Sequence, residues 1–136
     1  MKEIKSNIDN SVLHIIHRAN DSGSFRKELV PSTEFIQCSI INGNQDQKFR
    51  PHHHLYKEID FSKIIAQESW VIIKGAVQVT YYDKDNSKIT SEVMREGDIT
   101  ITLYGGHEYE ILEDDTLIYE FKTGPYFGPE KDKTYF

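Results

Sequence analysis

Cysteine, basic clusters and long apolar runs are all scarce in this chain of 136 residues, and each scarcity excludes a class of protein. The single Cys38 excludes an internal disulfide, and its apolar surroundings predict a small buried side chain. The net charge is −6 and no basic run is present, so we expect no nucleic-acid partner. No apolar run approaches the length of a membrane span, and the first residues lack a signal-peptide pattern. We therefore expect a soluble cytoplasmic protein with no membrane partner.

The composition that remains is that of one globular domain rich in strands. Hydrophobic residues make up 38% of the chain and aromatic residues 12%, which excludes a disordered chain. No segment has a long apolar stripe at helical spacing, and turn residues recur at the spacing of an all-β sandwich or barrel. We expect N-terminal strands in residues 1–33, a barrel in 34–126 and a C-terminal tail in 127–136 that wraps over the surface. The strand-like runs are residues 11–18, 34–41, 47–57, 69–82, 89–95, 99–103, 108–112 and 117–121.

One predicted strand is apolar on both faces. Trp70, Val71, Ile72 and Ile73 are consecutive, so the barrel interior can cover only half of their side chains. Residues 12–16 and 35–41 are apolar and can supply part of the remaining cover. The simplest supplier of the rest is a second copy of the chain, so we expect a homodimer with isologous contact.

Three adjacent histidines indicate a metal site. On a strand His52 and His54 point to one face and His53 to the other, so the first two can reach one metal ion. Two imidazoles alone bind weakly, and the natural additions are the carboxylate of Glu68 and the imidazole of His107. Glu68 is expected on the same buried face as Trp70 and Ile72, where an unpaired carboxylate would be costly.

These pieces resemble the two motifs of the cupin superfamily. The first motif is H-x-H, a spacer, Glu, six residues and Gly, which here reads His52 to His54, a spacer, Glu68, "SWVIIK" and Gly75. The second is Gly-Asp, an apolar strand, a glycine turn and His, which here reads "GDITITLYGGH" and ends at His107. The later segment "YEFKTGPYFGPEKDK" is similar to the C-terminal part of small single-domain cupins, including those tied to surface-polysaccharide gene clusters.

This resemblance implies a single-domain cupin-type β-barrel, also called a double-stranded β-helix or jelly roll. It implies a divalent metal, one of Fe, Mn, Ni, Zn or Co, bound by His52, His54, Glu68 and His107. The chain departs from the pattern between His54 and Glu68. Residues 55–67 form an insertion, expected to project at the barrel mouth, and Glu58 within it lies at the usual spacing of the glutamate.

Two function classes remain open at this point. The first is a metal-dependent enzyme acting on a small polar molecule such as a sugar or organic acid. The second is a non-catalytic module that binds or senses a small ligand, and a barrel that has lost its metal is a third. Tyr109 should share the face of His107, whereas His14 and His17 should lie on opposite faces of one strand and form no rival site.

Overall fold

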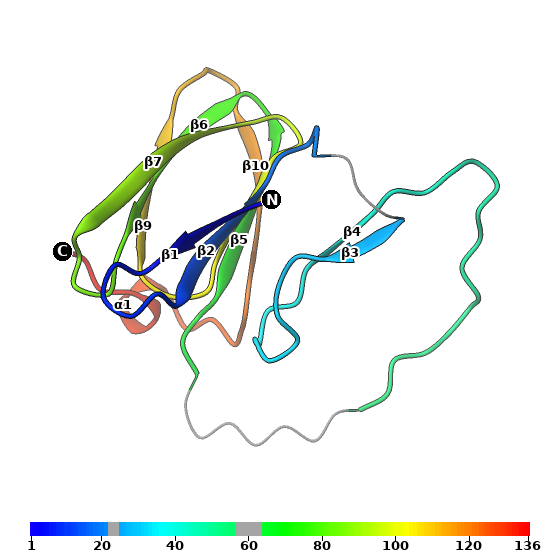
Figure 1. The fold of residues 1–136 in the computed structure, drawn as a ribbon, viewed down its shortest axis with the longest axis horizontal. Helices are drawn as coiled ribbons and strands as arrows, with labels where there is room; N and C mark the ends of the chain where they lie inside the picture. Colours follow the sequence, from blue (N-terminus) through cyan, green and yellow to red (C-terminus); the bar gives the residue numbers. More distant parts are fainter. Residues whose placement is uncertain (22–24, 57–63) are drawn as a thin grey trace.

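The structure is a computed structural model that describes residues 1–21, 25–56 and 64–136, and the regular secondary structure of these residues is almost entirely β-strand (Figure 1). Within them, every paired strand is antiparallel to its neighbour. The all-β class expected from the sequence is confirmed. The strands are β1 (Lys2–Lys5), β2 (Val12–His17), β3 (Arg26–Glu28), β4 (Ser39–Ile41), β5 (Glu68–Lys74), β6 (Ala76–Tyr82), β7 (Lys88–Arg95), β8 (Ile99–Thr102), β9 (Gly106–Ile111) and β10 (Leu117–Lys122), and the helix is α1 (Pro129–Asp132).

Two sheets face each other around the main core. One has the strand order β1-β2-β8-β5-β10 and the other the order β7-β6-β9. Ile16 and Ile72 from the first sheet pack with Val79, Tyr81 and Met94 from the second, and all five side chains are almost fully buried. Burial of such side chains is the main force that holds the two sheets together.

The strand pairing in the described residues forms separate sheets and no closed barrel. The third sheet contains only β3 and β4, and Figure 1 shows it beside the other two, with the chain running outward after it. Residues 47–56, expected to form a strand that carries the histidines, form none in the structure. This segment lacks the alternation of apolar and polar residues that would favour a half-buried strand.

A second apolar cluster covers the outer face of the five-stranded sheet. Ile15 of β2 and Ile101 of β8 pack there against Leu29 and Val30, with Cys38 partly buried at the edge. The chain therefore covers part of this face itself. Residues 35–41, expected to supply cover, contribute the partly buried Ile36, Cys38 and Ile40, whereas Leu29 and Val30 were not foreseen. The cover does not reach β10, where Tyr119 is 54% exposed and Phe121 57% exposed.

Gly75 separates two strands within the long run that the sequence indicated. Its φ angle is +84°, a conformation that other residues rarely adopt, and it ends β5 just before β6 begins. A side chain there would also collide with Thr116, because an added Cβ would lie 2.3 Å from its Oγ1. Gly75 thus has a structural role in the turn between the two facing sheets.

Candidate functional site

A cavity of about 800 Å³ opens at one end of the space between the two facing sheets. Its walls are formed by Glu68 and Trp70 of β5, His107 and Tyr109 of β9, and the C-terminal residues 132–136. The tail therefore folds over the sheets, as the prolines of residues 124–129 predicted. Phe136 packs edge-on against Tyr82 at a ring-centroid distance of 5.2 Å.

Glu68 and His107 meet in this cavity although they belong to different sheets. The Oε1 atom of Glu68 lies 3.4 Å from Nε2 of His107. Burial disfavours the charged form of Glu68, but the contact with His107 and the positive charge of Lys122 outweigh it and lower the pKa of Glu68. Glu68 is therefore a carboxylate at neutral pH, facing an imidazole. Two of the four residues predicted to bind a metal are thus brought together.

Trp70 and Tyr109 form a stacked aromatic pair beside Glu68 and His107. Their ring centroids are 3.6 Å apart with an interplanar angle of 4°, and the ring of His107 lies 5.0 Å from that of Tyr109. The expectation that Tyr109 shares the face of His107 is confirmed. Within the part of the chain that the structure describes, the buried Nε1 of Trp70 and Nδ1 of His107 have no hydrogen-bond partner. Such atoms are normally satisfied, so two unmet hydrogen-bonding groups lie in the residues that line the cavity.

Lys122 contacts Glu68 from the neighbouring strand. In the pairing of β10 with β5, Lys122 stands directly opposite Glu68, and its Nζ lies 3.8 Å from Oε2 of Glu68. Burial opposes the charge of Lys122, but its hydrogen bonds with Glu120 and Asp132 outweigh this and raise the pKa. The sequence reasoning missed Lys122, although it belongs to the segment quoted for its similarity to small cupins.

His14 lies close to the cavity but is not part of a metal site in the described residues. It is fully buried, with Nδ1 3.0 Å from Oγ1 of Thr102 and Nε2 3.5 Å from the carbonyl oxygen of Tyr82. Burial lowers the pKa of His14 to about 4, so the ring is neutral at pH 7. His14 is therefore a hydrogen-bonded core residue, in agreement with the interpretation of residues 12–17 as a strand.

His52 and His54 lie on the irregular segment that the figure draws away from the sheets (Figure 1). Both side chains are exposed, their rings are 5.2 Å apart, and Nδ1 of His52 lies 2.9 Å from the carbonyl oxygen of Arg50. Among the residues that the structure describes, no group of three or more His, Cys, Asp or Glu residues could hold a metal ion. The predicted set of four is therefore not assembled in this arrangement, and Glu58, the alternative glutamate, lies outside the described residues.

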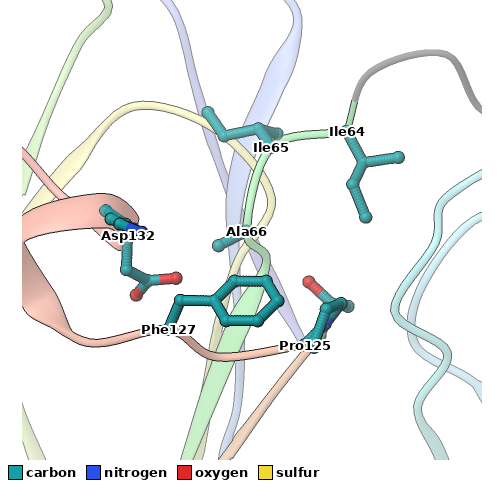
Figure 2. A pocket seen from close by; sticks show the side chains of 9 residues that line it. Ile64, Ile65, Ala66, Pro125, Phe127 and Asp132 are labelled. Atoms are coloured by element: carbon teal, nitrogen blue, oxygen red, sulfur yellow. The ribbon is translucent and has the colours of Figure 1, made fainter.

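A smaller pocket of about 290 Å³ adjoins the cavity. Figure 2 shows Ile64, Ile65 and Ala66 facing Phe127 and Asp132 across it. Ile65, Ala66 and Asp132 also line the cavity, so the two spaces share a wall. Of the predicted 55–67 insertion, the structure describes residues 55–56 and 64–67, and residues 57–63 lie outside the described residues.

Comparisons with known proteins found no matching family model, no matching curated protein and no matching solved structure. In the described residues, no helix is long and apolar enough to cross a membrane.

Proposed function

We propose that this chain is a small cupin-type protein whose cavity binds a small polar molecule beside Glu68 and His107. The observation that carries the proposal is the cavity of about 800 Å³ lined by Glu68, Trp70, His107 and Tyr109. Ligand sites typically have volumes of roughly 300–1,000 Å³, mainly apolar walls and a few well-placed polar groups. The cupin assignment is supported by the motif residues Glu68 and His107, which come from separate sheets and meet in one place.

The polar atoms of the site favour a ligand that carries hydroxyl groups. The Glu68 carboxylate only accepts hydrogen bonds, whereas the indole Nε1 of Trp70 only donates one. A hydroxyl group does both, so a sugar or a hydroxy acid can satisfy these two residues together. The stacked rings of Trp70 and Tyr109 supply a flat apolar surface for the carbon skeleton.

The second candidate is a metal-dependent enzyme that acts on the same kind of molecule. The contact between Glu68 and His107 favours it, because both residues are suitable ligands for a divalent metal. His52 and His54 do not fit in the described arrangement, so the candidate requires residues 43–56 to approach the cavity. Elemental analysis of protein purified without an immobilised-metal column tests this candidate, with His54→Ala expected to lose the metal and keep the fold.

Protein-observed NMR with monosaccharides and hydroxy acids tests the binding proposal. We expect at least one compound to shift the signals of Trp70, His107 and Tyr109, and we expect Glu68→Gln to weaken the binding of that compound. His53→Ala, an exposed change on the outer segment, is the matched control and should leave binding unchanged. Shifts confined to residues 43–56 or to the smaller pocket would contradict the proposal.

A further inference from the structure

We propose that the ammonium group of Lys122 occupies the cation position beside Glu68, so that the site is balanced by a side chain of the chain itself and not by a divalent metal. The inference concerns the same cavity as the proposed function and rests on that choice of site. It adds a role for Lys122, which positions the Glu68 carboxylate, and it predicts which cations the cavity rejects.

Three carboxylates converge on the Lys122 ammonium. Its Nζ lies 3.0 Å from Oε1 of Glu120, 3.4 Å from Oδ2 of Asp132 and 3.8 Å from Oε2 of Glu68. The ring of Tyr126 lies below the same nitrogen at 4.5 Å, which adds a cation–π contact. The side chain of Lys122 is only 17% exposed, so these charges are partly removed from water. Carboxylates this close to one another need a cation between them.

The position of the ammonium is fixed by sheet geometry. Lys122 faces Glu68 directly in the antiparallel register of β10 and β5, and Glu120 is two residues earlier on the same face. Asp132 comes from α1 in the tail, so one cation joins both sheet strands to the segment that covers the cavity. The ammonium is thus part of the folded framework.

Each oxygen of the Glu68 carboxylate faces a nitrogen atom of the chain in this arrangement. Oε1 contacts Nε2 of His107, and Oε2 contacts Lys122. A divalent ion at Glu68 would lie next to a positively charged ammonium, and this like-charge repulsion disfavours it. Replacing Lys122 with an uncharged residue of similar length removes the repulsion and leaves oxygen ligands together with His107, a set that suits Mn²⁺.

Titration of the full chain with Mn²⁺, read by electron paramagnetic resonance of the free ion, tests the inference. We expect Lys122→Met to bind Mn²⁺ roughly tenfold or more tightly than the wild type, because a like charge has been removed. The gain should disappear in the double variant Lys122→Met with Glu68→Gln. The matched control Lys122→Arg keeps the charge and should behave as the wild type does.

Stoichiometric Mn²⁺ binding to the wild type that is lost in Glu68→Gln would overturn the inference, and so would a folded Lys122→Met variant with no gain. A measurement on the wild type does not depend on the folding of any variant: equimolar Mn²⁺ should not broaden the ring signals of His107, and broadening would overturn the inference. These readouts report cation binding alone. A cavity that binds no small molecule would contradict the proposed function and leave the role of Lys122 standing.

Discussion

Asp98 gives the sharpest prediction about stability, because its carboxylate accepts three separate hydrogen bonds. Oδ1 accepts from the backbone N–H of Ala19 at 3.0 Å, and Oδ2 accepts from the N–H of Arg95 at 3.0 Å and from Nη1 of Arg18 at 2.7 Å. Asp98 is itself buried, and the two backbone hydrogen bonds that it accepts are partly buried, so the backbone donors are partly shielded from water if the acceptor is lost. Asp98 belongs to the Gly-Asp pair of the second motif, and the structure gives it a structural role.

Replacing Asp98 with Asn keeps the size of the side chain but removes its charge and turns one acceptor into a donor. Hydrogen bonds to a charged group contribute about 1.5–3 kcal/mol each, and they are not additive. Arg18 is 34% exposed, so water replaces much of its contact. We therefore expect the free energy of unfolding to fall by about 2–3 kcal/mol, chiefly from one backbone N–H left facing an amide group.

Urea unfolding followed by circular dichroism measures this change. The midpoint should fall by about 1 M or more with an unchanged slope. The control Asp114→Asn makes the same chemical change at an exposed position and should alter stability by less than about 0.5 kcal/mol. A loss for Asp98→Asn as small as that of the control would refute the reasoning.

Three further outcomes are expected. The pKa of His14 is about 4 in the folded chain and about 6.5 in the unfolded chain, so below pH 6.5 the unfolded chain binds a proton that the folded chain does not. The contribution of His14 to stability should therefore be constant above pH 6.5 and should fall by up to roughly 3 kcal/mol between pH 6.5 and 4. Urea midpoints should show this slope, and an equal slope in His14→Phe would argue against it. Gly75→Ala should lower the free energy of unfolding by about 2 kcal/mol or more, and with it the melting temperature. The control Gly43→Ala should leave the melting temperature unchanged, and equal effects of the two substitutions would contradict a strained turn at Gly75. The exposed Tyr119 and Phe121 should pair in a homodimer, and sedimentation at the monomer mass of 15.9 kDa would contradict this.

Periodicity predicted the strands where burial decides the structure. Residues 69–82, expected as one long strand-like run, form most of β5 and all of β6, and Gly75 marks the turn between them because only glycine readily adopts its φ angle. Strand alternation, which puts Glu68 on the same face as the apolar Trp70 and Ile72, also correctly predicted that Glu68 is buried. The short strand β1 was missed because Lys2 to Lys5 contains only one buried apolar residue, Ile4, and gives little periodic signal.

The candidate site was predicted only in part, because it depends on contacts between distant segments. Glu68 and His107 were named from their motifs, and the structure brings them within 3.4 Å. Lys122 was not named, since its partners Glu120 and Asp132 are defined by strand register and by the fold of the tail. His52 and His54 were expected on a strand by analogy with the motif, and the local sequence does not supply the alternation that a strand needs.

The most direct test of the central claim uses the fluorescence of Trp70, the only tryptophan in the chain and a wall of the cavity. Titration with a panel of monosaccharides and hydroxy acids should give a saturable change in emission for at least one compound. That change should weaken by about tenfold or more in Glu68→Gln, which loses a charged hydrogen-bond acceptor, and persist in His53→Ala. A compound whose binding, measured by calorimetry, leaves Trp70 emission unchanged and survives Glu68→Gln would contradict the account.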